Sequence, residues 1–282
     1  MNKEFYWNQA LELAATAIDN GALIPLKTEI YKLKNVHSCN FEVRILCSKE
    51  PPHLIDCLPK PNPFRPWDKR LEIATINDTH ILILNKYPVQ VGHMLLITKE
   101  WAPQNGWIEI DDWKAMSLID SDTTGLWFFN SDKKAGASQP HRHMQLLRRN
   151  REDLICPREL WIKDCINKIE SESLEELSSS LFVSKRTSQS KGNDAQVLND
   201  IYVDLCTRAG IGKPVLNRQP LMSYNLLITK SWVALIRRKE ECVHGFSINA
   251  LGFAGYLLAT SKSDINWLEK YGYELLLKSV AN

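Results

Sequence analysis

The feature that most constrains this chain is residues 136–145, which read Gly-Ala-Ser-Gln-Pro-His-Arg-His-Met-Gln. If a strand begins near His141, its two-residue period places His141, His143 and Gln145 on one face. Just upstream, Gly136 and the small residues after it allow a turn whose backbone N–H groups can approach phosphate oxygens. The stretch therefore predicts a strand with a polar wall beside a phosphate-binding turn.

The imidazole of His143 is well suited to attack phosphorus from this position. A neutral imidazole splits one difficult displacement into two easier ones through a covalent intermediate. Amide donors such as the Ser138 N–H and the Gln145 side chain would stabilise charge on the phosphoryl oxygens. Because the amide of Gln145 cannot donate a proton as an acid, the leaving group must be a weak base such as a polyphosphate.

The residues alone leave two other interpretations of these histidines open. Histidines two residues apart on a strand can bind zinc, with His93, His80 or a distant cysteine as a third ligand. They can also be hydrogen-bonded histidines of the core. The Gly-Ala-Ser turn next to them favours the phosphate-handling interpretation.

Composition excludes several classes of protein. The 35 basic and 33 acidic residues nearly cancel, which argues against a general nucleic-acid binder. No apolar run reaches the roughly 20 residues of a membrane span, and the N-terminal residues lack the pattern of a signal peptide. Seven cysteines without a CxxC pair indicate reduced, mostly structural thiols. We therefore expect a cytoplasmic enzyme with no membrane partner.

Periodicity and turn residues predict the elements along the chain. The first helix covers residues 1–23, with Trp7, Ala10, Leu11, Ala14 and Ile18 along one side. Later helices are expected over residues 111–119, 157–169, 195–210 and 248–259. Strands are expected over residues 29–33, 41–47, 71–76, 80–85, 92–98, 125–130, 143–149, 224–229 and 232–237, of which 80–85 and 92–98 form an antiparallel pair.

We expect a single domain over residues 1–282, with a core of about 20–150 and a C-terminal segment of about 195–282. A proline-rich loop over residues 51–66 interrupts the first part. The serine-rich and charged region of about 170–194 is predicted to be a polar surface excursion. Residues 95–101 and 226–232 share the pattern Leu-Leu-Ile-Thr-Lys-x-Trp, although seven residues are too few to prove a duplication.

The central motif resembles the histidine triad superfamily and, within it, the ATP adenylyltransferase or diadenosine tetraphosphate phosphorylase family. Histidine triad hydrolases carry a third histidine where this chain has Gln145, whereas the transferase branch carries glutamine. Uridylyltransferases of that branch usually have prolines where this chain has Arg142 and Met144. The resemblance spans most of the chain and is carried by Asn130 and residues 136–145, by residues 84–89 with His93, and by residues 62–64, 223–229 and 249–255.

The resemblance implies an α+β, histidine-triad-like fold, in which an antiparallel sheet has flanking helices. It also implies reversible phosphorolysis of diadenosine tetraphosphate by orthophosphate to ATP and ADP, with His143 as nucleophile and His141 orienting it. Arg237 is the basic residue that we would test first. The candidate substrate-binding residues are Lys49, Asn85, Lys86, Asn130, Gly136, Ala137, Ser138, Gln139, Gln145, Asn225, Thr229 and Arg237.

We expect no tightly bound cofactor, and a divalent cation such as Mg²⁺ to accompany the substrate. The sequence leaves the oligomeric state open. The enzymatic alternatives are a histidine triad dinucleoside polyphosphate hydrolase and another nucleotidyltransferase, such as an adenosine phosphosulfate adenylyltransferase or an enzyme that uses a sugar phosphate. The non-enzymatic alternative is a nucleotide-binding sensor on the same scaffold.

Overall fold

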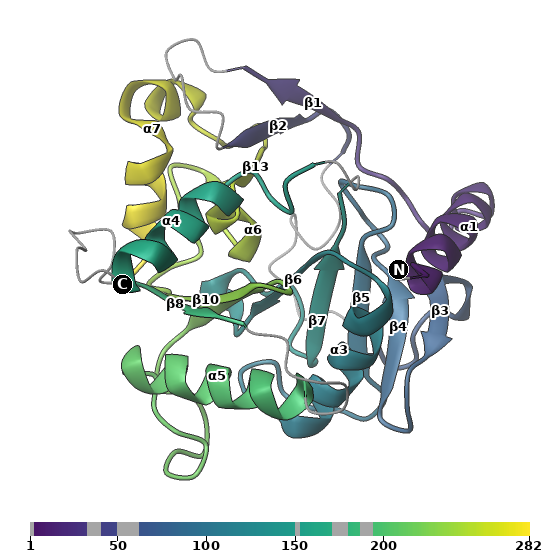
Figure 1. Cartoon of the computed structure of the whole chain (residues 1–282). Helices are drawn as coiled ribbons and strands as arrows, with labels where there is room; N and C mark the ends of the chain where they lie inside the picture. Colours follow the sequence, from purple (N-terminus) through teal and green to yellow (C-terminus); the bar gives the residue numbers. More distant parts are fainter. Residues whose placement is uncertain (1–2, 33–40, 50–61, 150–152, 171–179, 187–193) are drawn as a thin grey trace.

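An eight-stranded antiparallel sheet joins the two halves of the chain, in the order β3-β4-β5-β7-β6-β9-β10-β8 (Figure 1). The computed structural model describes residues 3–32, 41–49, 62–149, 153–170, 180–186 and 194–282. The predicted hairpin of residues 80–85 and 92–98 is confirmed. The strands are β3 (Glu72–Thr75), β4 (His80–Leu84), β5 (Met94–Thr98), β6 (Leu126–Asn130), β7 (His143–Leu147), β8 (Leu181–Lys185), β9 (Tyr224–Ile228) and β10 (Trp232–Arg237).

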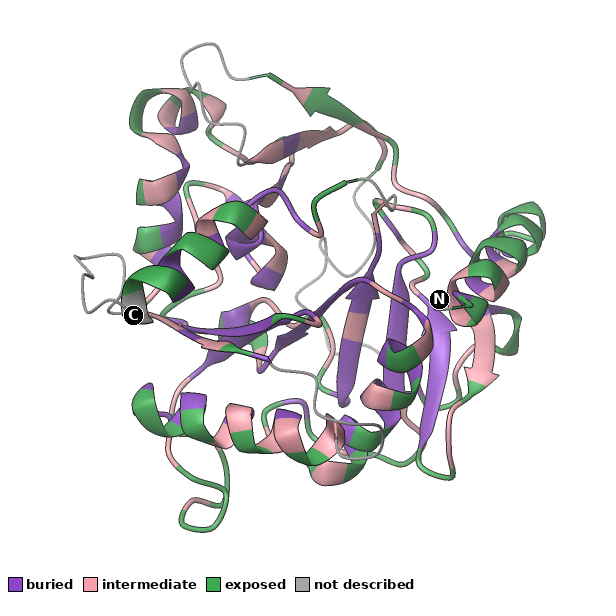
Figure 2. Cartoon of the chain, in the orientation of Figure 1, coloured by how far each residue is buried: buried purple, intermediate pink, exposed green. Residues whose placement is uncertain are grey.

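Helices cover both faces of this sheet, which explains why its central strands are apolar on both sides (Figure 2). Trp127 and Phe129 of β6 join the core on one face, whereas Leu126 and Phe128 join the core on the other. The first face is covered by α1 (Phe5–Asp19), α3 (Ile110–Asp122) and α5 (Asp194–Arg208). The second face is covered by α4 (Glu159–Glu170), α6 (Ala250–Phe253) and α7 (Ile265–Val280). This layering confirms the α+β prediction.

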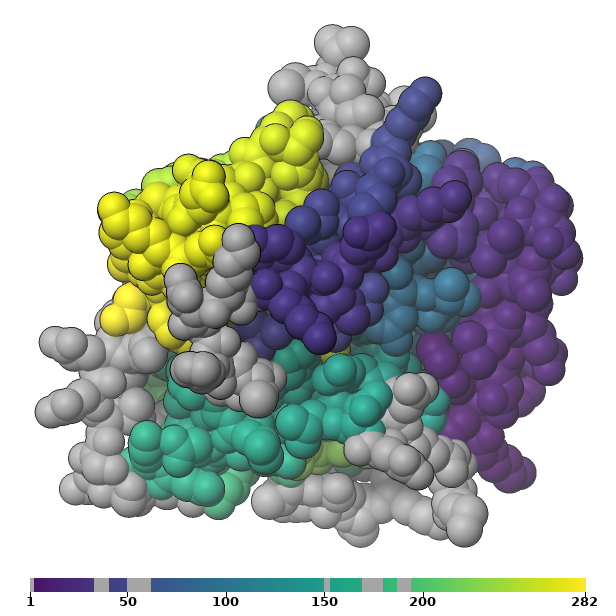
Figure 3. Space-filling view, turned by 90° about the horizontal axis from the view of Figure 1, so that it is seen from above, coloured from purple at the N-terminus to yellow at the C-terminus, as the bar shows by residue number. Residues whose placement is uncertain are grey.

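A second, three-stranded sheet lies above α6 and joins the beginning of the chain to its end. In it β2 (Glu42–Leu46) pairs antiparallel with β1 (Thr28–Tyr31) and parallel with β13 (Tyr256–Ala259). The Tyr31 hydroxyl donates to Glu269 of α7 at 2.7 Å, and the rings of Phe41 and Tyr273 stack with centroids 4.1 Å apart. Figure 3 shows the dark-blue β1 and β2 region beside the yellow C-terminal segment.

The first helix is confirmed, but the prediction of its buried side is partly wrong. Its buried residues are Ala10, Ala14 and Ala17, whereas Leu11 and Ile18 are 40% and 39% exposed. Three alanines at helical spacing let the helix backbone approach the core closely, so the larger side chains at neighbouring positions turn outward.

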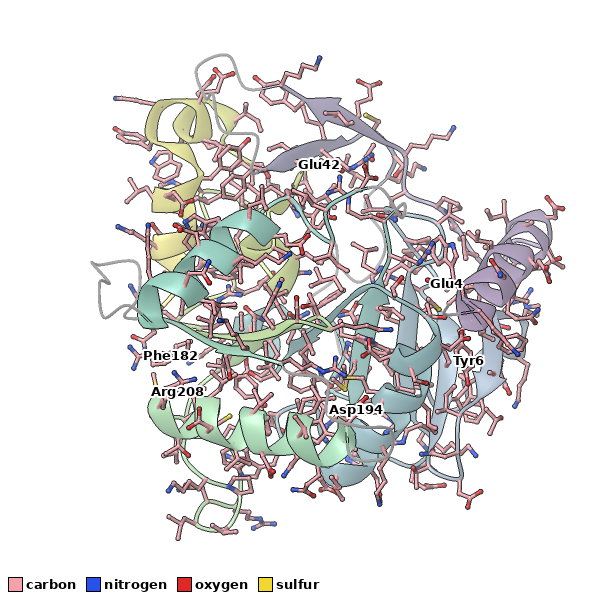
Figure 4. All side chains as sticks on the ribbon, in the orientation of Figure 1. Glu4, Tyr6, Glu42, Phe182, Asp194 and Arg208 are labelled. Carbon is pink, nitrogen blue, oxygen red and sulfur yellow. The ribbon has the colours of Figure 1, made fainter. Side chains whose placement is uncertain are left out.

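The predicted polar excursion is wrong over residues 181–185, because these form the edge strand β8. The strand pairs with β10 over its whole length, and Val183 is buried in the core beneath α4. Arg208 of α5 donates to the carbonyl oxygen of Val183 at 3.1 Å, and Figure 4 shows Arg208 close to Phe182 of this strand. Three apolar residues between polar flanks are too short a signal to mark a strand. Residues 171–179 and 187–193 lie outside the described residues.

The helix predicted over residues 248–259 is also wrong. The helix α6 ends at Phe253, Gly255 has a φ of 101°, and the following residues form β13. A positive φ ends a right-handed helix, and glycine adopts it without steric cost. The sequence interpretation missed α7, the short strands β11 (Cys242–Val243) and β12 (Phe246–Ser247), and the 3-10 helices Lys69–Leu71 and Lys133–Ala135.

The five described cysteines are free thiols, whereas Cys39 and Cys57 lie outside the described residues. Burial raises the pKa of Cys156 and of Cys206 to about 12, so both thiols stay protonated near neutral pH. No helix in the described part of the chain has both the length and the apolar character of a membrane span.

Candidate active site

His143 is the first residue of β7, and its imidazole is held in one tautomer. The Nδ1–H donates to the carbonyl oxygen of His141 at 2.8 Å, which leaves the lone pair on Nε2. Burial is the main cause that lowers the pKa of His143 to about 4, and the charge of Arg142 acts in the same direction. The ring is therefore neutral near pH 7, the form that can attack phosphorus.

His141 is fully buried and is fixed on both sides of its ring. Its Nε2–H donates to the carbonyl oxygen of Thr98 at 2.9 Å, and its Nδ1 accepts from the Asn62 side chain at 2.8 Å. The oxygen of the same Asn62 amide accepts from the Phe64 N–H at 3.0 Å. The Phe64 ring lies 5.6 Å from the His141 ring and 5.5 Å from the His143 ring, measured between centroids. These contacts orient the carbonyl group that in turn orients His143.

Gln145 lies on the same face of β7 as His143, as the alternation predicts, and contacts His93 from the neighbouring chain segment. Burial lowers the pKa of His93 to about 4, and the Gln145 side chain opposes this effect. The Nδ1 of His93 accepts from the Asn85 side chain at 3.1 Å. Asn85 and Gln145 therefore both contact the neutral imidazole of His93.

The turn before His141 is built around Asp132 and Gly136. The Asp132 side chain accepts from the Ala135 N–H at 3.0 Å, and its carbonyl oxygen accepts from the Ala137 N–H at 2.8 Å. Gly136 has a φ of 86°, and a Cβ there would lie 2.7 Å from the Cβ of Asn249. Both the conformation and the close packing require glycine at this position.

The turn leaves two backbone donors available for a ligand. The N–H groups of Gly136 and Ala137 are used inside the turn. Within the described ranges, the N–H groups of Ser138 and Gln139 have no protein acceptor, and Ser138 is exposed. Successive unpaired N–H groups form an anion-binding concavity. The predicted binding of phosphate by this turn stays a prediction, for which the N–H groups of Ser138 and Gln139 are the available donors in the described part of the chain.

A buried network of hydrogen bonds, formed by Asn130, Asn225 and Arg238, holds the same turn in place. The Asn130 oxygen accepts from the Asn225 side chain at 2.8 Å and from the Ala250 N–H at 2.9 Å. The Asn225 side chain also donates to the Ala135 carbonyl at 2.8 Å and accepts from Arg238 at 2.6 Å. Asn225 has no exposed surface, so in this structure it positions Asn130 and the turn.

Two predicted substrate-binding residues lie away from the turn. Thr229 follows β9 at the end opposite Asn225, about 13 Å further along the strand at 3.3 Å per residue. The Arg237 side chain donates to the Asn282 carbonyl at 3.1 Å and lies over the Phe182 ring. The structure therefore does not bring either side chain together with His143.

The two predicted lysines lie at the surface. Lys49 is exposed just beyond β2, and Lys86 is exposed directly after Asn85, with its ammonium group 5.8 Å from the centre of the Tyr87 ring. Their proposed contacts with substrate stay predictions.

The predicted set of site residues does not contain two residues that shape the site. Gln104, from the loop between β5 and α3, is 2% exposed and hydrogen-bonds to the backbones of Asn130 and His143. Arg238, next to the arginine predicted from the sequence, is the one that reaches Asn225 and the turn. A loop amide carries no periodic signal, and adjacent arginines at a strand end cannot be distinguished without the register.

His80, a possible third zinc ligand by its residue type, instead bonds to Asp112 through Nε2 at 3.0 Å. Asp112 also accepts from Arg142 at 2.6 Å, so this buried trio connects β4 and β7 to α3. Among the described residues, no three histidine, cysteine, aspartate or glutamate side chains gather as metal ligands would.

Comparison with known families gives two matches. Residues 1–154 match the family model of the Ap4A phosphorylase N-terminal domain, and residues 173–282 match that of the ATP adenylyltransferase C-terminal domain. Among curated relatives, Protein APA1 of Saccharomyces cerevisiae is 27% identical over 86% of this chain and 83% of its own length. Diadenosine 5',5'''-P1,P4-tetraphosphate phosphorylase 2 of the same yeast is 28% identical over 65% of this chain and 63% of its own length.

The fold is also similar to solved structures of the yeast Ap4A phosphorylase Apa2. One superposes with a TM-score of 0.74 at 22% identity, covering 100% of this chain and 95% of that one. The complex of Apa2 with Ap4A superposes with a TM-score of 0.70 at 24% identity, covering 98% and 95% of the two chains. At this identity the likeness establishes the shared fold.

Proposed function

This chain belongs to the Ap4A phosphorylase family, and we propose that it catalyses the reversible phosphorolysis of diadenosine tetraphosphate (Ap4A) to ATP and ADP. The observation that carries this proposal is the state of His143. Its ring is neutral, and its one N–H is committed to the His141 carbonyl, so that the Nε2 lone pair is available. The names of the yeast relatives indicate the same substrate.

The reaction proceeds in two displacements at one phosphorus. Nε2 of His143 bonds to the α-phosphorus, the bond to the bridging oxygen breaks, and ATP leaves with the electron pair. An oxygen of orthophosphate then attacks the same phosphorus, the P–N bond breaks, and ADP leaves. The hydrogen bond from Nδ1 to the His141 carbonyl stabilises the positive charge that the ring carries between the two steps.

The surrounding groups match the demands of this reaction. The unpaired N–H groups of Ser138 and Gln139 would hold the phosphoryl oxygens as their charge develops. Gln145, on the same face of β7 as His143, would donate to the same oxygens, and its amide cannot protonate a leaving group. A polyphosphate departs without such protonation, which supports Ap4A as the substrate.

We further propose that a divalent cation such as Mg²⁺ binds together with the polyphosphate and uses mainly phosphate oxygens as ligands. The expected partners are nucleotides and orthophosphate. A cytoplasmic location stays a prediction from the sequence.

The direct test is product analysis with Ap4A in the presence and absence of orthophosphate. The proposal requires equal amounts of ATP and ADP with phosphate and no turnover without it. Release of AMP without phosphate would show a hydrolase instead.

The His143→Ala variant tests the nucleophile. It should lose turnover by at least about four orders of magnitude and form no adenylyl-enzyme, while it still binds a non-hydrolysable Ap4A analogue. His141→Ala should lose less, because that ring acts through its orientation of His143. A His143→Ala variant with more than a small fraction of the wild-type rate would mean that another residue is the nucleophile.

A further inference from the structure

A side-chain amide replaces one rung of backbone hydrogen bonds beside the proposed nucleophile. The ladder between β6 and β7 reaches Phe128 and Gln145 and ends there. Two residues further, the same register would place Asn130 opposite His143. The side chain of Gln104 lies between these two residues instead.

The amide of Gln104 satisfies three backbone groups at once. Its oxygen accepts from the His143 N–H at 2.8 Å. Its nitrogen donates to the Asn130 carbonyl at 2.7 Å and to the His143 carbonyl at 3.2 Å. The side chain is 2% exposed, so water does not compete for these bonds.

The loop that carries Gln104 is itself tied to the chain leading into β7. The Gln104 N–H donates to the Pro140 carbonyl at 2.8 Å, and the Arg142 N–H donates to the Ala102 carbonyl at 2.8 Å. Pro103 and His141 form an antiparallel bridge between these two bonds. These bonds fix the position of the Gln104 backbone, so that its side-chain amide lies between β6 and β7.

We propose that Gln104 is a positioning residue for His143, an inference that rests on the proposed function. Its amide keeps Asn130 and His143 one amide width apart and fixes the backbone from which the imidazole projects. Among the residues that the structure describes, the Nδ1 of His143 bonds to the carbonyl of His141, two residues earlier, so a shift of this backbone would move the reactive Nε2. Loss of the amide thus changes the approach of Nε2 to phosphorus more than it changes substrate binding.

An amide can accept from one N–H group and donate to two carbonyl groups in this arrangement. Methionine at position 104 would fill a similar volume and leave three buried backbone groups without a partner. A carboxylate would repel the carbonyl oxygens of Asn130 and His143. A protonated carboxyl group, however, could accept from the His143 N–H and donate its O–H to the Asn130 carbonyl.

The first experiment compares Gln104→Met with Asn105→Met, which changes the exposed neighbour in the same loop. Single-turnover formation of the adenylyl-enzyme from Ap4A should slow on the order of 100-fold in Gln104→Met, because displacement of reacting atoms by about 1 Å has this effect. The KM for Ap4A should change less than about three-fold, and Asn105→Met should match the wild type. A Gln104→Met rate within about three-fold of wild type, in folded protein, would overturn the inference.

The second experiment uses Gln104→Glu as a variant whose defect depends on pH. Burial raises the pKa of a carboxyl group at this position, whereas the nearby Arg142 guanidinium, which donates to the Pro103 carbonyl, opposes this effect. In either case the proton that restores the donor is gained as the pH falls. The ratio of the Gln104→Glu rate to the wild-type rate should therefore increase from about pH 7.5 to about pH 5.5. A pH-independent ratio would mean that the amide only fills space.

The two hypotheses fail in different ways. If wild-type protein forms no adenylyl-enzyme, the proposed function is wrong, whatever the variants do. The positioning role then rests on amide hydrogen exchange at His143, which should accelerate in Gln104→Met relative to the neighbouring β7 amides and stay slow in Asn105→Met. If the wild type is active and exchange at His143 is the same in both variants, the positioning role is wrong and the proposed function stands.

Discussion

The two copies of the pattern Leu-Leu-Ile-Thr-Lys-x-Trp end two strands of one sheet, β5 and β9, which are separated by β7 and β6, and the two copies have opposite surroundings. In the first copy, at the end of β5, Trp101 is 50% exposed and its ring lies 5.3 Å from that of His141. In the second copy, at the end of β9, Trp232 is 1% exposed and belongs to the core beneath α4 and α7. The same pattern thus lies beside the candidate site in one place and inside the core in the other.

The difference arises from the path of the chain after each threonine. The Thr229 N–H donates to the Trp232 carbonyl at 2.9 Å, so the second copy closes a tight turn and Trp232 begins the next strand. The Thr98 N–H donates to the Arg142 carbonyl instead, and the chain continues into the loop that carries Gln104. Nearly identical local sequences therefore lead to a hairpin in one context and to the loop that carries Gln104 in the other.

The largest expected effect of this contrast is on stability. Trp232→Ala should lower the free energy of unfolding by about 3–5 kcal/mol, because it removes a fully buried aromatic side chain. Trp101→Ala should lower it by less than about 1 kcal/mol, since half of that side chain is already in water. Urea denaturation followed by circular dichroism measures the free energy of unfolding of both variants. Equal losses would mean that the two tryptophans do not differ in their contribution to the core.

The second largest effect is expected at acidic pH, which should destabilise the strands beside the first copy more than those beside the second. His93 and His143, beside the first copy, have pKa values lowered to about 4 by burial, and the only histidine of residues 195–282 is His244. Below the unfolded value of about 6.5, the unfolded state binds more protons than the folded state. Stability should therefore fall as the pH drops from about 6.5 to about 4, by at most about 1.4 kcal/mol per histidine and pH unit.

The measurement for this acid effect is hydrogen exchange by mass spectrometry, corrected for the intrinsic pH dependence of exchange. Protection in β5 and β7 should decrease before protection in β9 and β10. Simultaneous loss in all four strands would indicate that the sheet responds as one unit.

The smallest effect distinguishes the two threonines. The Thr98 hydroxyl contacts Nε2 of His141 at 2.8 Å, whereas the Thr229 hydroxyl accepts from the N–H groups of Ser231 and Trp232 at 3.2 and 3.1 Å. Replacement of either threonine by valine should cost about 1 kcal/mol of stability. Only Thr98→Val should also reduce turnover, roughly ten-fold, through the orientation of His141. A raised KM in Thr229→Val would instead support the substrate contact predicted from its sequence.

Most strands and the helices α1, α3, α4 and α5 could be predicted from the sequence, because each has several residues of clear periodicity. The edge strand β8 could not, since it gains its order from pairing with β10 and from Arg208 of α5. The helix expected over residues 248–259 was interrupted by Gly255, whose role depends on the contact of β13 with β2. Elements that depend on a distant partner have no local signature of their own.

The candidate site also contains residues that could be recognised from the sequence and residues that could not. His143, Gln145 and the turn at Gly136 were recognisable because the chemistry and the two-residue period lie within ten consecutive residues. Gln104 was not, because its partners Asn130 and His143 are 26 and 39 residues away. Arg238 contacts the Ala135 carbonyl 103 residues away, and Asn62 contacts His141 79 residues away, so their roles also depend on the fold.

The sequence by itself therefore determined most strands, the helices α1, α3, α4 and α5, and the candidate catalytic stretch of residues 136–145, since all of these rest on spacing along the chain. Tertiary structure alone decided which Leu-Leu-Ile-Thr-Lys-x-Trp copy borders the site, which arginine supports the turn, and which amide separates Asn130 from His143. The physical reason is that backbone periodicity is local, whereas burial and hydrogen-bond partners depend on chain segments brought together only by folding.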